Sequence, residues 1–548
     1  MGSIGQWSAL SQKCIDIQKN SLPAQWALPV DKLATKSSGD ITSLPQTSGV
    51  LSDLELQMTE QDADSILQKY LSSDWTVRQV TTAYLKRATI GQQMASSSSW
   101  ATWILNFATE FLSNEALARA DELDEYFART GKLAGPLHGI PISIKEHLEL
   151  AGKITHAGFV SKISHVSDED ALIVKLLRDA GAVLHVRTNQ PQSLMHLDCD
   201  NNITGRTLNP YNLRLTPGGS SGGEGASVGF RASVMGVGTD IGGSIRVPAA
   251  FNNCYGLRPT TLRNSNLGLY GINAGQESIR GVAGPLGQSL NDLEIFQKAL
   301  LDQQPWGIDT TLIPVPWQNV ELPANFTVGV MMDDGMVKPH PPVLRALEST
   351  SKKLRAAGIN VVPWEPFDHK HGWDIVAALY FPDGGEGYRA EFDKTGEPEL
   401  PLTTWAIQYS REQPLSIREN WSLNASREAY RKAYHQLMKE RGVDVILCPA
   451  YPGAGALQGT PKYWNYTAIW NILDQPSVVM PSGLRCDRSL DKFDNEHVAR
   501  SEEDEREWQA YDPDLFHDFP IALQVVGKHW QDEVLLKAAK KIEEAIRA

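Results

Sequence analysis

The 548-residue chain carries 65 acidic and 51 basic side chains, a net charge of -14, and 41% of its residues are hydrophobic. This balance is typical of a globular protein and argues against a nucleic-acid-binding protein, which needs clustered basic residues. No run of about 18 apolar residues is present, so no membrane span is expected. Five scattered cysteines favour reduced thiols in a cytosolic protein.

Residues 1–50 are rich in Ser, Gln and Pro with little periodicity, which predicts an N-terminal extension over the surface. The first residues lack the basic and apolar segments of a secretory signal, and Gln6 stands where a myristoylation signal has Ser or Thr. Thr59, followed by acidic residues, predicts a capped helix over 59–72, and apolar spacing predicts a second helix over 76–92. Both helices are expected to be scaffold.

Beyond these helices the sequence alternates between strand and helix patterns. The stretch GIPISIKE (139–146) places its isoleucines on one face and Lys145 on the other, which predicts a strand. Ser167 is expected to cap a helix that runs to about Ala180, and a strand over 182–186 is expected to follow it. A helix that leads directly into a strand indicates a sheet that is largely parallel or mixed.

The C-terminal part repeats this alternation. The Pro-rich residues 302–323 and the aromatic residues 365–425 predict loops that either shape a pocket or only cover the periphery. The acidic run SEEDERE (501–507) predicts a solvated loop. Three short apolar strands and a closing amphipathic helix are expected at residues 444–450, 477–483, 520–527 and 531–546.

The stretch TPGGSSGGEGAS (216–227) has the composition of a flexible linker, yet it continues into apolar and small residues without a domain boundary. A phosphate-binding loop is not supported, because the Gly-x4-Gly-Lys-Ser/Thr motif is absent and GVGTDIGG spaces its glycines wrongly for a dinucleotide site. GGSSG, centred on Ser220, matches the nucleophile elbow of α/β hydrolases, but the Asn- and Pro-containing segment before it makes a poor strand. None of the three interpretations is favoured.

A second glycine-flanked serine, Ser244, follows in GTDIGGSIRVP. Small residues before a serine allow backbone N–H groups to converge into a nest that can bind the oxyanion of an acyl-transfer intermediate. Two serines in such backbone, together with Lys145 on a strand, suggest a proton relay that needs no histidine. Spacing alone does not establish this triad.

Three blocks, at residues 135–147, 217–229 and 236–260, strongly resemble the amidase signature family, and its fungal acetamidase-type members most closely. The 24-residue step from Ser220 to Ser244 also fits that family. The resemblance implies an α/β fold with a large mixed, mostly parallel sheet covered by helices on both faces. It also implies a single domain over 51–548, with a signature core at 130–262 and a variable, pocket-shaping region at 302–440.

By this resemblance Ser244 is the nucleophile, Ser220 the serine that bridges proton transfer, and Lys145 the base, which must be neutral to accept a proton. The family also places a cis peptide bond before the bridging serine, here between Gly219 and Ser220. Pattern alone leaves open that Lys145 is only a solvent-facing lysine of an edge strand. The N–H groups expected to bind the oxyanion are those of Ile241, Gly242, Gly243 and Ser244.

Residues beside the nucleophile are expected to support it. Thr239, Asp240 and Arg246 would hydrogen-bond or pair around the serine, although a purely structural ion pair explains Asp240 and Arg246 equally well. One departure from the family is Glu146, where many members carry aspartate. This change puts in doubt the hydrogen bonding that keeps Lys145 oriented.

Leu194 and Met195 lie where the family lines its acyl pocket, and ordinary core packing explains them at least as well. His369 and His371 lack a third ligand at metal-binding spacing and are interpreted as surface residues. The proposed chemistry needs no metal and no organic cofactor.

The resemblance implies an acylamide amidohydrolase that acts on the linear C–N bond of a small-molecule amide, with primary amides of small aliphatic or aromatic acids favoured. An acyltransferase or amide-forming enzyme with the same acyl-enzyme is the alternative. A tRNA amidotransferase subunit and a binding protein without activity are weaker alternatives. The sequence leaves a homodimer open.

Overall fold

The computed structural model describes the chain except for residues 1–5, 29–38, 98–99 and 409–412. Within the described residues, β1 (Met94–Ser97) and β2 (Trp100–Trp103) form a small antiparallel sheet, and eleven further strands form one large sheet. Its strand order is β10 (Asn360–Pro363), β9 (Thr327–Val330), β11 (Val445–Cys448), β13 (Pro520–Val526), β12 (Ser477–Arg485), β7 (Tyr255–Arg258), β8 (Val282–Gly287), β6 (Met235–Asp240), β4 (Pro141–Lys145), β5 (Val183–Thr188) and β3 (Ala108–Phe111).

The large sheet is mixed, as predicted. In the described part of the chain, four of its ten strand pairings are parallel, namely β10–β9, β9–β11, β4–β5 and β4–β6. The other six pairings are antiparallel, so the sheet contains fewer parallel neighbours than expected.

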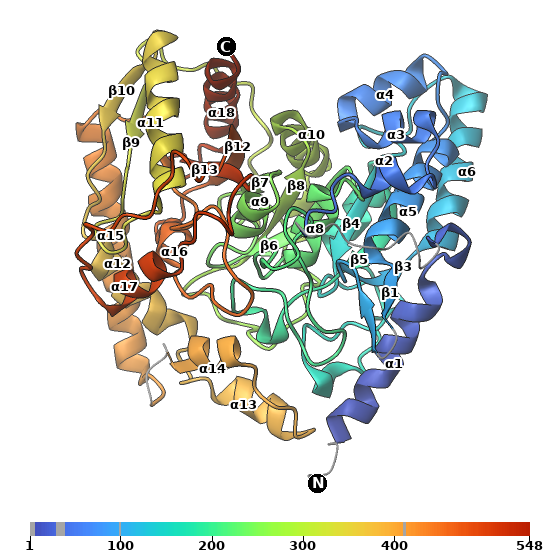
Figure 1. Ribbon diagram of the computed structural model, residues 1–548, viewed down its shortest axis with the longest axis horizontal. Coiled ribbons are helices and arrows are strands. Elements are labelled where there is room, and N and C mark those ends of the chain that lie inside the picture. The colour runs from blue at the N-terminus through green and yellow to red at the C-terminus, as the bar shows by residue number, and fades with distance from the viewer. Residues whose placement is uncertain (1–5, 29–38, 98–99, 409–412) are drawn as a thin grey trace.

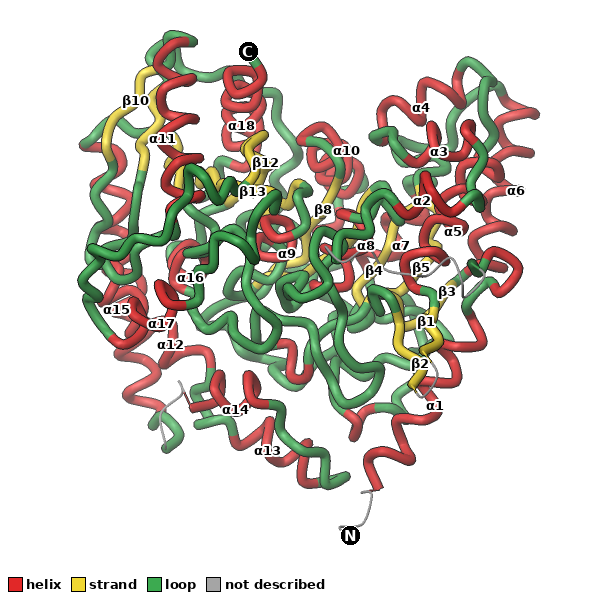
Figure 2. Tube along the Cα trace, viewed as in Figure 1, coloured by secondary structure: helices red, strands yellow, loops and turns green. Residues whose placement is uncertain are grey.

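The helices gather at the two ends of this sheet and over its centre (Figures 1 and 2). The N-terminal helices lie beside β3 to β5, and helices of the C-terminal half lie near β9 and β10. The helices are α1 (Gln6–Ser21), α2 (Leu44–Ser48), α3 (Asp53–Thr59), α4 (Ala63–Leu71), α5 (Val77–Gln92), α6 (Ser113–Thr130), α7 (Leu172–Asp179), α8 (Gly222–Gly229), α9 (Arg246–Phe251), α10 (Leu290–Leu301), α11 (Pro341–Ala356), α12 (His369–Tyr380), α13 (Glu386–Asp393), α14 (Pro401–Gln408), α15 (Ile417–Glu440), α16 (Asn465–Ile472), α17 (Glu502–Gln509) and α18 (Asp532–Arg547).

Helices cover both faces of the sheet. Val478 and Met480 of β12 lie in a hydrophobic cluster with residues of α11 and α18. Val479, between them, lies in another cluster with residues of α9, α12, α15 and α16. Because successive side chains of a strand point to opposite faces, these two sets of helices lie on opposite sides of the sheet.

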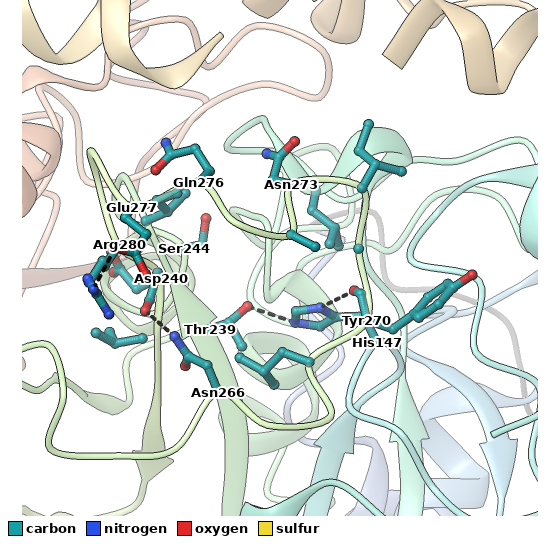
Figure 3. Close-up of a pocket in the computed structure, with 18 of the residues that line it drawn as sticks. His147, Thr239, Asp240, Ser244, Asn266, Tyr270, Asn273, Gln276, Glu277 and Arg280 are labelled. Carbon is teal, nitrogen blue, oxygen red and sulfur yellow. Dashed lines mark hydrogen bonds and ion pairs between the residues drawn. The ribbon is translucent and has the colours of Figure 1, made fainter. Parts of the chain in front are cut away.

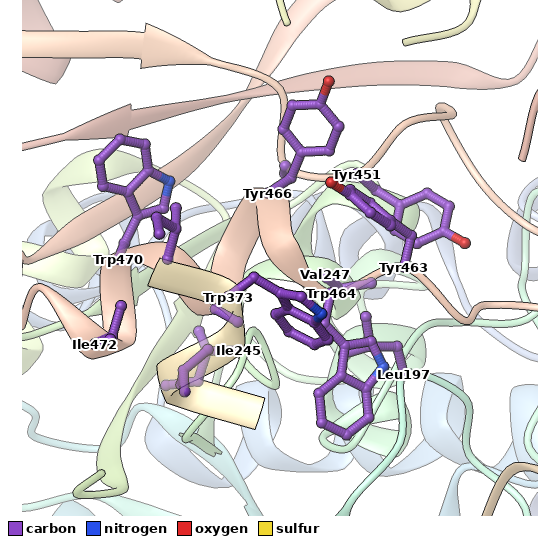
Figure 4. Close-up of a cluster of buried hydrophobic side chains, with 14 of the residues drawn as sticks. Leu197, Ile245, Val247, Trp373, Tyr451, Tyr463, Trp464, Tyr466, Trp470 and Ile472 are labelled. Carbon is purple, nitrogen blue, oxygen red and sulfur yellow. The ribbon is translucent and has the colours of Figure 1, made fainter. Parts of the chain in front are cut away.

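The cluster that contains Val479 is rich in aromatic side chains and includes Ile245, the residue that directly follows Ser244 (Figure 4). Ile245 and Val247 are fully buried in it, together with Trp464 at the start of α16. Interdigitated interiors of this kind resist displacement, because any shift opens voids and loses contacts. The packing therefore fixes the backbone on the C-terminal side of Ser244.

Most of the predicted elements are confirmed, with ends that differ by a few residues. The helix expected over 76–92 is α5, and the strands expected over 139–146 and 182–186 are β4 and β5. The four C-terminal elements are β11, β12, β13 and α18.

Two predicted helix starts are wrong. The helix expected over 59–72 is broken, because α3 ends at Thr59 and α4 begins after Asp62, whose carboxylate accepts a hydrogen bond from the N–H of Ser65. Ser167 caps no helix, since α7 begins only at Leu172. Both errors come from reading a cap residue without the tertiary contacts that decide where a helix can begin.

Three predicted irregular segments contain helices. The acidic run 501–507 belongs to α17, whose cap Ser501 accepts a hydrogen bond from Asp504, and acidic residues in a first turn interact favourably with the helix dipole. Residues 365–425 hold α12, α13 and α14, and residues 1–50 hold α1 and α2. In α12 the buried side chains lie on more than one side of the helix, whereas α17 buries only Asp504 and Glu507, so neither helix shows a single apolar stripe.

Candidate active site

Lys145 is the last residue of β4, and its side chain is fully buried. Its amine nitrogen lies 2.7 Å from the hydroxyl of Ser220 and 3.0 Å from the hydroxyl of Thr239. Burial lowers the pKa of Lys145 to about 7, although nearby acidic groups such as Asp240 act in the opposite direction. A neutral amine is therefore accessible near neutral pH, and Lys145 is not a solvent-facing lysine of an edge strand, because β4 is paired on both sides.

Ser220 lies in a tight bend directly before α8, and the peptide bond between Gly219 and Ser220 is cis, as the resemblance implied. A side chain at position 219 would place its Cβ 2.1 Å from the backbone oxygen of Asp198. Gly218 has φ of +77° and faces the backbone at Pro248. Glycine is therefore required at both positions by close approach or backbone conformation. In the described residues no strand leads directly into Ser220, so the bend is not the nucleophile elbow of an α/β hydrolase.

Ser244 lies between β6 and α9, and its hydroxyl reaches a cavity (Figure 3). Its carbonyl oxygen accepts a hydrogen bond of 3.1 Å from the N–H of Ser221, which ties the two serine-bearing segments together. Within the described residues the hydroxyls of Ser220 and Ser244 share no hydrogen bond with each other. Both residues line the same cavity.

The loop from Ile241 to Ser244 is held by contacts from distant parts of the chain. The Tyr380 hydroxyl donates to the carbonyl of Ile241 at 2.9 Å, and the Thr467 hydroxyl donates to the carbonyl of Gly242 at 2.7 Å. These bonds fix the peptide planes of the loop and so the directions of its N–H groups.

The N–H groups predicted to bind an oxyanion are not all free. The N–H of Gly243 donates to the carboxylate of Asp240 at 2.9 Å, and the N–H of Ile245 donates to the same carboxylate at 3.1 Å. No acceptor is found within the described chain for the N–H groups of Ile241, Gly242 and Ser244. The loop thus offers these three donors without any rearrangement.

Asp240 and Arg246 form a fully buried ion pair with two contacts of 3.0 Å. Burial alone would raise the pKa of Asp240, but the Arg246 guanidinium holds it well below its usual value. Arg246 also donates to the side chains of Asn471 and Gln524 and to the carbonyl of Thr467. The pair thus connects the Ser244 loop to α16 and β13.

Ser220 and Ser244 line a cavity of about 410 Å³. Leu194 and Met195, predicted as an apolar wall, are both part of its lining. The other apolar lining residues are Phe159, Ile241, Leu262, Leu267, Leu269, Tyr270, Ile272, Ala274, Val282, Leu312 and Tyr388. Pockets of this size and character bind small organic molecules.

Residues 80–536 match the family model of the amidases. The chain belongs to the amidase family. It is 37% identical to an acetamidase of Emericella nidulans over 536 residues, which covers 95% of each chain. It is 34% identical to an acetamidase of Aspergillus oryzae over 541 residues, 96% of each chain. The solved structure of a fatty acid amide hydrolase, 37% identical, superposes with a TM-score of 0.93 over 98% of this chain and 95% of that one.

Several residues of this amidase site were missed by sequence reasoning. His147, Tyr270 and Tyr388 line the cavity, and Tyr380 and Thr467 hold the Ser244 loop. His147 lies only two residues after Lys145, and that proximity was the one available signal. The others are brought to the site by tertiary packing, which leaves no local pattern.

Glu146 does not contact the amine of Lys145. Its carboxylate accepts hydrogen bonds from the backbone N–H groups of His156 and Ala157, at 2.7 and 3.1 Å, and from the side chain of Gln190. The glutamate therefore braces the segment that follows β4 and influences Lys145 only through the backbone.

Two further expectations concern metals and membranes. His371 is exposed, but His369 is buried and its ring bonds to the hydroxyl of Tyr434 at 3.1 Å, so its interpretation as a surface residue is wrong. Among the described residues, no group of three or more His, Cys, Asp or Glu is placed to hold a metal ion. None of the described helices is long and apolar enough to cross a membrane. The five cysteines are free and buried.

Proposed function

We propose that this amidase hydrolyses a carboxylic acid amide to the carboxylate and ammonia, or an amine, through an acyl-enzyme on Ser244. The observation that carries this proposal is the buried amine of Lys145, 2.7 Å from the hydroxyl of Ser220, beside a cavity that Ser244 shares. A buried lysine whose hydrogen-bond partners in the described chain are hydroxyls is suited to proton transfer, because burial favours its neutral form more strongly than the surrounding acidic groups favour the charged form.

The proton path follows from this arrangement. The Oγ of Ser244 bonds to the amide carbon, its proton passes to the Oγ of Ser220, and the proton of Ser220 passes to the neutral amine of Lys145. The oxyanion accepts hydrogen bonds from the N–H groups of Gly242 and Ser244. As the C–N bond breaks, the protons return and the nitrogen leaves as ammonia or amine. Water then attacks the acyl-enzyme by the same path and frees Ser244.

The cavity supports a substrate with an apolar acyl group. Phe159, Leu194 and Met195 provide an apolar wall on the same cavity as Ser220 and Ser244, and 410 Å³ is more than the smallest amides can fill. The relatives named above include acetamidases and a fatty acid amide hydrolase. We therefore propose primary amides of aliphatic or aromatic acids as substrates, with larger members preferred over acetamide. A cytosolic location is part of the same proposal.

The test is ammonia release from a panel of primary amides, from acetamide to aryl and long-chain amides. We expect Ser244→Ala to lose activity about a thousandfold or more, because the nucleophile is removed. Ser227→Ala is a matched control, since Ser227 bonds to Ser233 at 2.8 Å outside the cavity and its variant should keep wild-type turnover. Retained turnover in Ser244→Ala would rule out this serine as nucleophile.

The same assay separates hydrolysis from acyl transfer. Added hydroxylamine competes with water for the acyl-enzyme, and a hydrolase should still release mostly carboxylate. If hydroxamate dominated at low hydroxylamine, the acyltransferase alternative would replace this proposal. Release of ammonia from free glutamine, with none from simple amides, would instead support an amidotransferase subunit.

A further inference from the structure

The hydroxyl of Thr239 lies within hydrogen-bond distance of both Lys145 and His147, and Figure 3 shows its contact with His147. The Nε2 atom of His147 is 2.9 Å from this hydroxyl, and the Nδ1 atom is 3.1 Å from the carbonyl oxygen of Tyr270. The N–H of Tyr270 donates back to the carbonyl of His147 at 2.9 Å, which fixes the position of the Tyr270 backbone. A continuous chain of hydrogen bonds thus runs from Tyr270 to Lys145.

When His147 is neutral, each hydrogen bond in this series has only one possible donor and one possible acceptor. Burial, together with the nearby Lys145, lowers the pKa of His147 to about 3, so the ring carries one N–H at neutral pH. The Tyr270 carbonyl can only accept, so Nδ1 carries that proton and Nε2 is an acceptor. The donor to Nε2 is the hydroxyl of Thr239, which has a single proton.

The direction of the hydrogen bond between Thr239 and His147 decides the direction of the one between Thr239 and Lys145. Because the proton of Thr239 points to His147, Thr239 offers Lys145 only a lone pair. The neutral amine therefore gives an N–H to Thr239, and its own lone pair remains for the other close neighbour, Ser220, at 2.7 Å. If Thr239 were free to turn, its hydroxyl could donate to that lone pair and occupy it.

We infer that His147 is a positioning residue that keeps the lone pair of Lys145 directed at Ser220 by holding the proton of Thr239. The inference rests on the proposed function, since it concerns the base of the same reaction. His147 touches no reacting atom in this scheme. It acts through Thr239, and it links the catalytic base to Tyr270, which lines the cavity.

The other titratable groups that influence the pKa of Lys145 do not orient its lone pair. They are Cys199, Asp240 and Glu224. Burial raises the pKa of the Cys199 thiol to about 12, which keeps it neutral, and its S–H bonds to Thr207. Asp240 is paired with Arg246, and Glu224 bonds to Ser143 and Thr188.

The test compares His147→Phe with the wild type, because phenylalanine keeps a flat ring and removes both nitrogens. We expect kcat for the best amide to fall about tenfold, the scale of one hydrogen bond, with KM nearly unchanged. We also expect the acidic limb of the pH profile to move to lower pH, because a hydroxyl that donates to the lone pair stabilises the neutral amine.

An alkyl fluorophosphonate gives a second measurement that does not need the natural substrate. The phosphorus bonds to Ser244 Oγ, fluoride leaves, and the serine proton enters the same relay. The rate of this labelling should fall in His147→Phe by the same factor as kcat. Wild-type rates and an unshifted pH limb in this variant would overturn the inference.

Two further variants separate positioning from a loss of folding. His147→Gln restores an amide that can donate to Tyr270 and accept from Thr239, so it should recover part of the rate and the original pH limb. In a Thr239→Val background, His147→Phe should lower kcat little further, because the hydroxyl that His147 orients is absent. Additive losses in that double variant would also overturn the inference. A wild type inactive on every amide would instead remove the proposed function on which it rests.

Discussion

The segment 130–262 and the C-terminal half of this amidase contribute to the site in different ways. The first contains Lys145, Ser220 and Ser244, the three side chains proposed to exchange protons. The second holds the Ser244 loop through Tyr380 and Thr467, which lie 139 and 225 residues from their partners in the chain. Reacting groups are thus encoded locally, whereas their geometry depends on contacts between distant segments.

This difference predicts two kinds of variant. A change to a reacting group should abolish turnover and leave the fold intact. A change to a holding contact should alter kcat modestly, alter stability, or do both, because the loop remains but is less well fixed. The following variants test that division, from the largest expected effect to the smallest.

Lys145→Met should have the largest effect on activity. The base is removed while the side-chain volume is nearly kept, so we expect kcat/KM to fall by about two to four orders of magnitude. The melting temperature should not fall, because a buried amine is replaced by an apolar group of similar size. Lys175→Met is the control, since Lys175 is exposed and pairs with the exposed Glu169. Parallel losses of activity and folding would make Lys145 a structural residue.

Arg246→Met should show the largest loss of stability. Arg246 is fully buried, and its removal leaves the Asp240 carboxylate without its cation, so we expect about 3–5 kcal/mol of destabilisation. Arg178→Met removes an ion pair with Asp170 in which the arginine side chain is about half exposed, and it should cost less than about 1 kcal/mol. Denaturant unfolding measures both. If both variants lost the same free energy of unfolding, the buried Asp240–Arg246 pair would be no more important for stability than a surface ion pair.

The sequence predicted the half of the site that lies in short, glycine-rich motifs. Ser220, Ser244 and Lys145 could be singled out because their neighbours are constrained by close approach, as at Gly219, and because the blocks resemble a family. Tyr380 and Thr467 could not, because a hydroxyl that reaches a loop across the fold leaves no local signature. The elements of the sheet were largely foreseen, since short apolar strands have a clear pattern.

The prediction failed for the helices within residues 365–425. Residues 365–425 showed no clear periodicity, yet they contain α12 to α14. In α12 the buried residues include the consecutive Ile375, Val376 and Ala377, which point to different sides of the helix, so no single apolar stripe appears. Tertiary packing decides such helices, and with them the position of the Tyr380 hydroxyl.

The pH dependence of kcat/KM tests the role of Lys145 as the base without any substitution. Only neutral Lys145 can accept a proton, and burial lowers its pKa to about 7, so activity should rise through pH 7 and level off above it. Two units below this pKa about one per cent of the amine is neutral, so the rate at pH 5 should be roughly a hundredfold lower. A flat profile between pH 5 and 8 would contradict this assignment of the base.

Stability should respond to the same group in the same direction. The unfolded lysine titrates near its ordinary pKa of 10.5 and the folded one near 7, so the unfolded state binds more protons between these values. The contribution of Lys145 to stability therefore increases from pH 7 to about pH 10.5. Lys145→Met should remove that part of the pH dependence, which unfolding of both proteins at pH 7 and 9 can measure.

Tyr380→Phe should have the smallest effect on kcat, and it directly tests a contact that holds the Ser244 loop. It removes the hydroxyl that donates to the carbonyl of Ile241, so the peptide before Gly242 is less well oriented and its N–H less well aimed. We expect kcat to fall about tenfold or less, with KM unchanged, because the oxyanion exists only during the reaction.

Tyr434→Phe is the matched control for this variant. Its buried hydroxyl bonds to Trp364 and His369, away from the loop, so its loss should lower the melting temperature without lowering kcat. If Tyr380→Phe and Tyr434→Phe lowered kcat equally, the effect of Tyr380 would come from general packing. A loss confined to Tyr380→Phe would instead show that a contact 139 residues away in the chain helps to set the geometry of the oxyanion loop.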